Sequence, residues 1–481
     1  MITIVEQILK NGKQMPDKTA LCDGKKEITY AELAGMIAES KTILINEYHL
    51  KKGDFVILSA DKQLEFVGLY FACHLIGAIV LPIAPDINEK RYEMIKDRVH
   101  PSLVVGFADR DVMVADLSEF AKKESAKTNQ IVQYPDLDEV ADIMFTTGTT
   151  GTPKGVKLTH RNIAAAAHNI NTFIKNQSDD VEMIALPISH SFGIGRMRCA
   201  LSNGQTVLML GSFTNIKRFY NYIDKYHVTG FGMVPASWAF LKKFSGTKIS
   251  DYKNQLRYIE IGSAPMPISD KQELIKILPN TRICMHYGLT EASRSAFIEF
   301  HKEQQHLDTI GKQTPNMHIT IRDENGCELP CGQEGEICVE GDAVTTGYYN
   351  LPKEEAFWAN SFRTGDWGLM DENGYITLKS RKKELINVGG KKVSPLEVEE
   401  VLMSFDFIKD CACIALPDPE GILGEVVKAY VVTDSPEKIV KGEMSALIGK
   451  RLEGYKHPAE YAIIDSIPKT SSGKVQRLLL Q

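Results

Sequence analysis

The longest apolar run in the chain, residues 66–84, most narrows the folds that the sequence can adopt. It reaches membrane-spanning length on paper, but Gly77 and Pro82 break it. The pattern predicts a buried helix over residues 65–75 that stops near Gly77, followed by a strand over residues 78–83. A continuously apolar strand is typical of a sheet covered on both faces, so we expect layered α/β architecture and no transmembrane segment.

Other strand-like segments repeat this alternation at residues 54–58, 103–105 and 206–210, with helical stretches between them. The 481 residues, 43% hydrophobic and 25% charged, suffice for a globular protein of several domains or subdomains. A net charge of -6 gives no reason to expect a nucleic-acid partner. The N terminus lacks the basic and apolar regions of a signal peptide, and the nine cysteines include no C-x2-C pair. We therefore expect a cytoplasmic protein with free thiols.

A second, smaller domain is predicted from the C-terminal residues. Ser394-Pro-Leu-Glu397 is a capping box with proline at the first helical position, and it predicts a helix through about Phe405. The remaining pattern consists of strand-like segments and one helical segment, at residues 411–416, 426–432, 440–452 and 461–464. These elements favour a compact α+β unit of about a hundred residues, an ordinary domain size.

The segment F-T-T-G-T-T-G-T-P-K-G at residues 145–155 indicates a polyphosphate site. Glycines let backbone N–H groups turn toward an anion, threonine hydroxyls add donors, and Lys154 adds a positive charge. The P-loop template of ATPases is not met, because Lys154 follows Pro153 and Gly155 comes after it. From these residues alone, a Gly/Thr surface loop without a ligand stays an alternative.

Four later segments are also unusual. His190 lies in a strand-to-turn setting, where a ring bonded to backbone is the structural alternative. The turn of small residues at 261–266 would let a flat ring approach the backbone, as nucleotide sites require. H-Y-G-L-T-E at residues 286–291 offers an aromatic face, a hydroxyl and a carboxylate for base stacking, phosphate and Mg²⁺. R-T-G-D at residues 363–366 supplies an acceptor suited to ribose hydroxyls, or simply a β-turn aspartate.

In this order the segments resemble the adenylate-forming enzyme superfamily, which includes acyl-CoA synthetases, aryl-CoA ligases, nonribosomal-peptide adenylation domains and firefly luciferase. The resemblance spans nearly the whole chain, with matches at residues 28–33, 77–82, 145–155, 287–291, 362–366 and 468–474. It implies a large N-terminal domain of layered α/β subdomains plus a β-rich subdomain over residues 1–382. A small mobile C-terminal α+β domain would follow over residues 383–481, with a hinge at Lys383.

The resemblance also assigns the ATP site. The phosphates would be held by Thr146, Thr147, Gly148, Thr149, Thr150 and Lys154. The remaining nucleotide contacts would come from Gly262, Ser263, Ala264, Pro265, His286, Tyr287 and Gly288, with Tyr287 beside adenine, and from Asp366 and Arg381 at the ribose. Thr290 would contact phosphate and Glu291 would bind Mg²⁺. Two departures are Thr147, where the family commonly has serine, and Ser380, where glycine usually opens the motif around Arg381.

In relatives a lysine matching Lys474 stabilises negative charge while the substrate carboxylate attacks the α-phosphate of ATP and pyrophosphate leaves. The small domain then rotates about the position of Lys383 and brings the region of Gly389 and Gly390 to the pantetheine channel. His190 matches a histidine that borders the acyl pocket and the thiol channel. One cleft would thus serve two half-reactions.

The resemblance therefore predicts an AMP-forming acid–thiol ligase that uses ATP, Mg²⁺ and, as the acceptor, coenzyme A. The alternatives are a stand-alone adenylation enzyme that loads the phosphopantetheine arm of an acyl or peptidyl carrier protein, a luciferase-like oxygenase, and a non-catalytic binding protein. A free α-amino acid is disfavoured as substrate, because no acidic residue lies between Pro187 and Leu210 to pair with its ammonium. Arg196, Arg198 and Arg294 would either meet a second anionic or strongly polar group of the substrate, or face solvent or pair with nearby glutamates.

Overall fold

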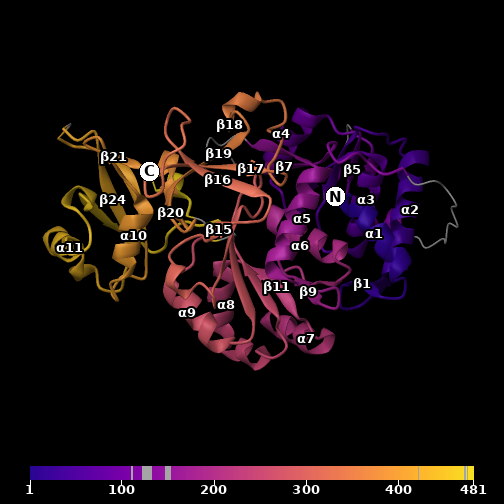
Figure 1. Cartoon of the computed structure of the whole chain (residues 1–481), viewed down its shortest axis with the longest axis horizontal. Coiled ribbons are helices and arrows are strands. Elements are labelled where there is room, and N and C mark those ends of the chain that lie inside the picture. The colour runs from indigo at the N-terminus through magenta and orange to yellow at the C-terminus, as the bar shows by residue number, and fades with distance from the viewer. Residues whose placement is uncertain are drawn as a thin grey trace. The chain divides into compact units, whose positions relative to one another are not determined.

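The computed structural model describes residues 1–109, 112–121, 133–146, 153–420, 422–470, 473 and 475–480. Contacts between residues divide the chain into two compact units. Unit 1 comprises Met1–Leu307, Gly311–His318 and Val339–Phe362, and unit 2 comprises Asp308–Ile310, Ile319–Cys338 and Arg363–Gln481. Helices and strands alternate along much of unit 1, so the predicted mixed α/β fold class is confirmed (Figure 1).

A six-stranded sheet in unit 1 has the order β6-β5-β3-β4-β7-β8. In chain order its strands are β3 (Phe55–Ser59), β4 (Ile79–Ile83), β5 (Leu103–Val105), β6 (Val114–Ala115), β7 (Val140–Thr146) and β8 (Lys154–Thr159). The pairs are parallel except for the hairpin of β7 and β8. Almost every side chain of β3 and β4 is buried, which agrees with the expectation from their continuous apolar sequence.

A nine-stranded sheet, also in unit 1, has the order β15-β14-β13-β12-β11-β9-β10-β1-β2. Its strands are β1 (Thr19–Cys22), β2 (Glu27–Thr29), β9 (Val181–Ile184), β10 (Thr206–Met209), β11 (Gly230–Met233), β12 (Tyr258–Ile261), β13 (Arg282–Tyr287), β14 (Ala296–Glu299) and β15 (Lys312–Gln313). The strands from β13 to β1 in this order are parallel, so their carboxyl ends meet at one edge, where ligands bind in open α/β sheets.

The helices of unit 1 are α1 (Ile4–Gln14), α2 (Tyr30–Asn46), α3 (Leu64–Ile76), α4 (Glu89–Val99), α5 (His160–Ile174), α6 (Ser191–Ser202), α7 (Ile216–Tyr226), α8 (Pro235–Ser245) and α9 (Ile268–Ile277). Helix α3 ends at Gly77, as its sequence predicts, in the left-handed conformation. Helices α5 and α6 pack side by side (Figure 1). Helix α5 contacts β8 of the six-stranded sheet and α6 contacts β9, β10 and β11 of the nine-stranded sheet, so this pair joins the two sheets.

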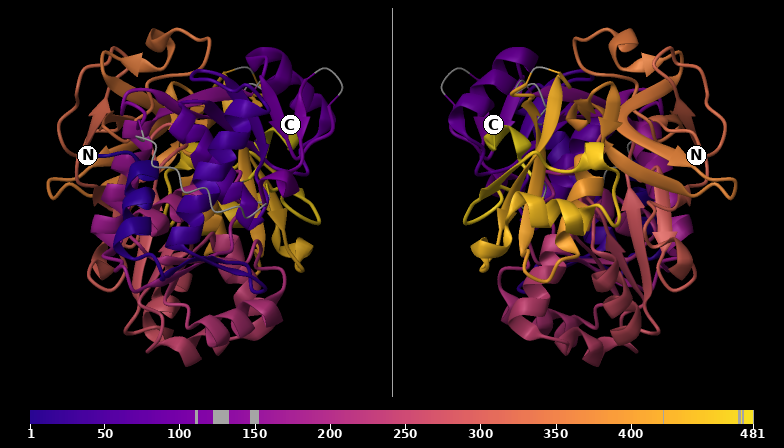
Figure 2. Two further views of the ribbon diagram at one scale, coloured as in Figure 1. Left: turned by 90° about the vertical axis from the view of Figure 1, so that its right-hand side faces the viewer. Right: turned by 90° about the vertical axis from the view of Figure 1, so that its left-hand side faces the viewer.

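A five-stranded sheet contains β16 (Met317–Arg322), β17 (Gly335–Gly341), β18 (Phe357–Trp358), β19 (Ser361–Met370) and β20 (Ile376–Arg381). Unit 2 also contains the hairpin of β21 (Ile386–Val388) and β22 (Lys391–Val393), helices α10 (Pro395–Met403) and α11 (Lys441–Ile448), and a sheet of β23 (Asp410–Pro417), β24 (Glu425–Val432) and β25 (Glu460–Ile463). The right-hand view of Figure 2 faces these C-terminal elements.

The predicted α+β content of the C-terminal segment agrees with these elements. Ser394 caps α10 by accepting a hydrogen bond from the Glu397 amide at 3.3 Å. Helix α10 ends at Met403 and α11 at Ile448, each a few residues before the predicted end, and Gly449 is the C-cap of α11. No helix among the described residues is long and apolar enough to cross a membrane.

Candidate active site

The hairpin of β7 and β8 carries the Gly/Thr-rich segment. Thr146 and Lys154 are paired across the hairpin, at the end of β7 and the start of β8. The structure therefore brings together two of the predicted phosphate ligands. The other four, Thr147, Gly148, Thr149 and Thr150, lie outside the described residues.

Two arginines of α4 hold the backbone at the ends of these two strands. Arg91 Nη2 donates a hydrogen bond to the Phe145 carbonyl at 3.2 Å, and Arg98 Nη1 donates one to the Pro153 carbonyl at 2.6 Å. The arginines are seven positions apart and so share one helix face. That spacing is the one signal in the sequence that indicates a shared surface, and motif matching misses it.

Glu291, the predicted Mg²⁺ ligand, is half-buried in the loop between β13 and β14. Its Oε1 accepts a hydrogen bond from the Tyr348 hydroxyl at 2.7 Å. The ring of Tyr348 lies beneath the Lys154 ammonium, with 4.9 Å between Nζ and the ring centroid. Tyr348 therefore contacts both the predicted phosphate lysine and the predicted metal carboxylate. No sequence motif indicates this residue, since it is a lone tyrosine after a glycine.

His190 is the residue immediately before α6, at its N-cap. Burial by neighbouring groups and then the Arg91 guanidinium lower the pKa of its imidazole, although part of the residue is exposed. His190 is therefore predominantly neutral at pH 7. The next residue, Ser191, places its Oγ 3.3 Å from Thr290 Oγ1, which brings the predicted phosphate contact Thr290 to the first turn of α6.

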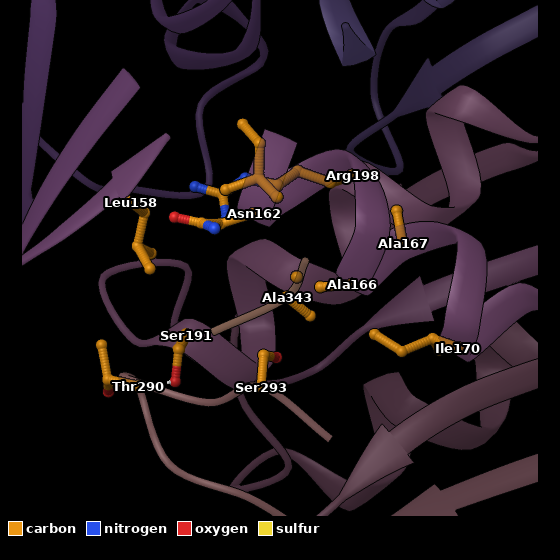
Figure 3. Close-up of a pocket in the computed structure, with 12 residues that line it drawn as sticks. Leu158, Asn162, Ala166, Ala167, Ile170, Ser191, Arg198, Thr290, Ser293 and Ala343 are labelled. Atoms are coloured by element: carbon orange, nitrogen blue, oxygen red, sulfur yellow. Dashed lines mark hydrogen bonds between the residues drawn. The ribbon is translucent and has the colours of Figure 1, made fainter. Parts of the chain in front are cut away.

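A cavity of about 20 Å³ lies behind this contact (Figure 3). Ser191 and Thr290 stand at one side of it, and Arg198 and Asn162 stand at the other. Small side chains form much of the remaining wall, including Ala166, Ala167, Gly195, Ser293 and Ala343. A volume of this size accommodates about one water molecule.

A buried cluster of charges lies between α6 and β12. Arg196 donates through Nε to Glu182 Oε1 at 2.8 Å and lies 3.2 Å from Glu260. Arg294 Nε donates to Glu260 Oε1 at 3.0 Å, and His286 Nδ1 lies 2.7 Å from the same oxygen. Burial opposes ionisation of Glu260, but Arg294, His286 and Arg196 outweigh it, so the pKa of Glu260 lies below its ordinary value. Burial also lowers the pKa of the His286 imidazole, despite the carboxylate beside it.

Arg294 and its partners connect three predicted site segments. Its two terminal nitrogens donate to the carbonyls of Ser191 and Phe192 in the first turn of α6, each at 3.2 Å. Arg294 itself has a left-handed φ of 53°, a conformation that is costly for arginine and that these bonds help to hold. The arginine thus ties α6 to the loop of Thr290 and Glu291, while Glu260 adds the end of β12.

The turn after β12 receives the His286 ring directly against its backbone. A Cβ on Gly262 would stand 2.1 Å from the ring, so no other residue fits there without moving the imidazole. Ser263 follows in the left-handed region, with φ of 75°, and Ala264 and Pro265 continue the turn toward α9. Tyr287 ends β13 and is buried, and Gly288 follows it. The predicted nucleotide-binding residues of these two segments are therefore neighbours in the structure.

A second buried cluster lies on the other side of α6. Arg198 bonds through Nη2 to Asp142 of β7 and to the Tyr70 hydroxyl of α3. Asp142 also accepts from Tyr70 at 2.9 Å and lies 3.0 Å from His74 Nε2. The sequence did not decide what the three arginines of this region contact. In the structure all three pair with buried carboxylates: Arg196, Arg198 and Arg294.

In unit 2, Asp366 of β19 and Arg381 of β20 are cross-strand partners. Arg381 Nε lies 2.9 Å from Asp366 Oδ1, and its Nη1 donates to the Thr364 carbonyl at 3.1 Å. The structure thus joins the two residues predicted at the ribose. Ser380, in place of the family's usual glycine, is buried beside them.

Lys383 lies in the short 3-10 helix Lys382–Glu384 that follows β20. Gly389 and Gly390 form the two-residue turn of the β21–β22 hairpin, with φ of 58° and 81°. Positive φ at both central positions defines the type I′ turn that best matches strand twist, which explains the Gly-Gly sequence. Contacts do not locate a hinge, so the domain boundary at Lys383 stays a prediction.

The C-terminal tail that carries Lys474 is anchored just beyond that residue. Lys474 itself lies outside the described residues. Arg477 Nη2 donates to both oxygens of Glu399 in α10, at 2.7 and 2.9 Å. Burial raises the pKa of Glu399 to about 7, with Arg477 opposing the shift. Sequence motifs gave no sign of this anchor.

The residues around Glu291 suit one Mg²⁺ ion shared with phosphates. Its second oxygen, Oε2, has no hydrogen-bond partner among the described residues, because Tyr348 occupies only Oε1. Within the same described ranges, no group of three or more His, Cys, Asp or Glu side chains is placed to hold a metal. A single carboxylate completed by substrate phosphates is the usual manner of Mg²⁺ binding.

Comparison with known proteins identifies the family. The family model described as AMP-binding enzyme matches residues 8–349, and the model of the AMP-binding enzyme C-terminal domain matches residues 397–474. The chain belongs to this family. The predicted resemblance to adenylate-forming enzymes, with a large N-terminal and a small C-terminal domain, is confirmed.

Among curated relatives, 4-coumarate-CoA ligase 1 of Narcissus pseudonarcissus is 28% identical, with 97% of this chain and 91% of the relative covered. Oxalate–CoA ligase of Arabidopsis thaliana is also 28% identical, with 98% and 97% covered. The solved o-succinylbenzoate coenzyme A synthetase MenE of Bacillus subtilis, in complex with ATP and magnesium, is 26% identical with a TM-score of 0.87 and 98% of each chain covered. The predicted enzyme class, an AMP-forming acid–thiol ligase, is confirmed.

Proposed function

We propose that this protein activates a carboxylic acid with ATP to an acyl-adenylate, releases pyrophosphate, and passes the acyl group to the thiol of coenzyme A. The observation that supports the proposal is the contact of Tyr348 with both Lys154 and Glu291, because these are the cation predicted to bind phosphate and the carboxylate predicted to bind Mg²⁺. The ligase relatives and the ATP and magnesium in MenE support the same cofactors here.

In the first half-reaction an oxygen of the acid forms a bond to the α-phosphorus of ATP, and the bond from that phosphorus to the β-phosphate oxygen breaks. Lys154 and Thr146 would bind the phosphates that leave as pyrophosphate. Glu291 would hold Mg²⁺, which neutralises phosphate charge when bound. Lys474 would stabilise the charge that develops during attack, and Asp366 with Arg381 would bind the ribose.

In the second half-reaction the thiol gives up its proton to a base, and the sulfur forms a bond to the acyl carbonyl carbon. The bond from that carbon to the phosphate oxygen breaks, and AMP leaves. His190 is suited to border this step, because its lowered pKa keeps the imidazole neutral and able to accept a proton near pH 7. Lys383 and the turn at Gly389 and Gly390 are proposed to serve the domain rotation between the steps.

The acid is not fixed by the relatives, whose names specify 4-coumarate, oxalate and o-succinylbenzoate. The ion pairs of Arg196 and Arg294 favour an acid without a second anionic group, because both guanidiniums already have buried carboxylate partners. A free α-amino acid is also disfavoured, because no acidic residue lies between Pro187 and Leu210.

The test is ATP–pyrophosphate exchange with radiolabelled pyrophosphate over a panel of aliphatic, aryl and dicarboxylic acids, followed by product analysis with coenzyme A. Exchange together with acyl-CoA is the expected result. Exchange without acyl-CoA would favour a carrier protein as acceptor. No exchange with any acid, combined with tight ATP binding, would favour a non-catalytic binding protein instead.

Lys474→Ala separates the half-reactions. We expect a loss of adenylation of about a hundredfold or more, since a preorganised charge at the transition state is removed. Thioester formation from a supplied acyl-adenylate should change little. Equal losses in both assays would contradict the assignment of Lys474.

Lys383→Pro tests the hinge. Proline fixes φ and should restrict rotation, so thioester formation should slow about tenfold or more while pyrophosphate exchange persists. Lys382→Ala, a neighbouring change without a backbone constraint, is the control. An unchanged thioester rate in the proline variant would place the hinge elsewhere.

A further inference from the structure

Tyr348 occupies the space between two opposite charges of the proposed site. Its ring faces the Lys154 ammonium at 4.9 Å, and its hydroxyl donates to Glu291 Oε1 at 2.7 Å. Lys154 and Glu291 do not form an ion pair with each other in the described part of the chain. Each charge thus contacts a different part of one aromatic side chain.

The backbone around Tyr348 is fixed to both partners. Val156 and Tyr348 form a β-bridge, and the Tyr349 amide donates to the Gly155 carbonyl at 2.7 Å, next to Lys154. On the other side, the Thr345 amide donates to the Glu291 carbonyl at 2.7 Å. The segment from 343 to 349 therefore lies between β8 and the loop of Glu291 and sets the distance between them.

Asn162 of α5 and Thr345 make this segment rigid. Asn162 Nδ2 donates to the Val344 carbonyl at 2.8 Å, and Thr345 Oγ1 donates to the Lys157 carbonyl at 2.5 Å. Both side chains are buried. These bonds hold the backbone of the segment that carries Tyr348.

We propose that Tyr348 is a positioning residue that keeps Lys154 and Glu291 apart and correctly aimed, so that the cation stays available to phosphate and the carboxylate to a divalent metal. Without the ring, the two side chains would be free to pair and neutralise each other. Without the hydroxyl, the carboxylate would lose the donor that orients it, as happens when an outer-shell partner of a metal ligand is removed. The inference rests on the proposed function.

The experiment measures equilibrium binding in the absence of any acid, so that no reaction occurs. Binding of ATP alone is followed by calorimetry, and binding of Mn²⁺ in the presence of saturating ATP is followed by electron paramagnetic resonance. The proteins are wild type, Tyr348→Phe, Tyr348→Ala and the control Tyr349→Phe. Tyr349 is adjacent in the same segment, and its ring packs on Phe55 while its hydroxyl has no hydrogen bond among the described residues.

We expect Tyr348→Phe to bind Mn²⁺ about tenfold more weakly with ATP affinity changed less than twofold, because the ring stays and only the hydroxyl is lost. Tyr348→Ala should weaken both Mn²⁺ and ATP, and Tyr349→Phe should match wild type. If Tyr348 had only a structural role, its substitution would lower thermal stability, and it would not weaken Mn²⁺ binding more than ATP binding.

Unchanged Mn²⁺ affinity in Tyr348→Phe, or an equal loss of ATP and Mn²⁺ affinity, would overturn the positioning role while the proposed function stands. Absence of ATP binding in the wild type would overturn the proposed function and this inference with it. Because Tyr348→Phe retains the ring and the backbone, the test does not depend on whether the alanine variant folds.

Discussion

Helix α6 carries two buried arginines, and their surroundings differ. Arg196 meets two carboxylates, Glu182 and Glu260, with Arg294 as a second cation. Arg198 meets the single carboxylate Asp142, with uncharged donors around it. The first cluster reaches the proposed active site through Arg294 and His286, whereas the second joins α6 to β7 and α3.

The difference concerns how well each cluster tolerates the loss of its arginine. Removal of Arg196 leaves Glu260 with Arg294 but leaves Glu182 with only the Tyr258 hydroxyl, which is costly because unpaired buried charges are poorly solvated. Removal of Arg198 leaves one carboxylate that Tyr70 and His74 still contact and that can take up a proton. Loss of the arginine should therefore lower the stability of the protein more in the first cluster, which contains more buried charges.

Breaking the first cluster should have the largest effect. We expect Arg196→Met to lower the free energy of unfolding by about 3–5 kcal/mol, the range for a buried ion pair that loses one partner. Urea unfolding followed by fluorescence measures it. Arg161→Met on α5, which removes an exposed pair with Asp138, is the matched control and should have little effect. A loss no larger than that of the control would show that Arg196 is not needed to balance the cluster.

Breaking the second cluster should cost less and depend on pH. For Arg198→Met we expect a loss of about 2–3 kcal/mol at pH 7. In wild type, burial would raise the pKa of Asp142, but Arg198 and His74 lower it below its ordinary value. That contribution to stability is present above the unfolded pKa and disappears as the pH falls.

Without Arg198, burial should raise the pKa of Asp142, so the carboxyl takes up its proton at higher pH. The difference in stability between variant and wild type should then shrink from pH 7 to pH 5. Urea unfolding at the two pH values measures it. A difference that grows toward acid would contradict the described role of Arg198.

The smallest effect concerns His160, which packs on His74 with 5.1 Å between ring centroids. Burial lowers its pKa to about 3 from 6.5. Because the unfolded chain takes up this proton first, stability is lost as the pH falls below 6.5, by about 2 kcal/mol between pH 7 and pH 5. His160→Leu should reduce the acid-induced loss by that amount in urea unfolding. His168→Leu, a partly exposed position on the same helix, is the control, and an equal reduction there would contradict the assignment to His160.

Much of the fold was predictable because its signals are local. The stop of α3 at Gly77, the apolar strand β4 and the cap of α10 at Ser394 each follow from a few adjacent residues. The ends of α10 and α11 were predicted too late. No glycine or proline directly follows α10, whereas Gly449, the C-cap of α11, was a local stop signal that the prediction overlooked.

The site was predictable only as far as its motifs extend. Four predicted site residues lie in characteristic sequence segments, and in the structure all four belong to unit 1: Thr146, Lys154, Thr290 and Glu291. The roles of Tyr348 and Arg98 arise from contacts between segments distant in sequence, which no local pattern encodes. For the same reason the carboxylate partners of Arg196 could not be chosen among the chain's many acidic residues.

The placement of the two arginines on α6 also restricts which mutations the protein can tolerate. Arg196 and Arg198 point to different sheets because each residue turns the helix by about 100°. A single-residue insertion or deletion between His190 and Arg196 would turn both guanidiniums away from their carboxylates at once. It would also displace His190 at the start of the helix. We infer that this stretch tolerates substitutions of its apolar residues far better than any change in its length.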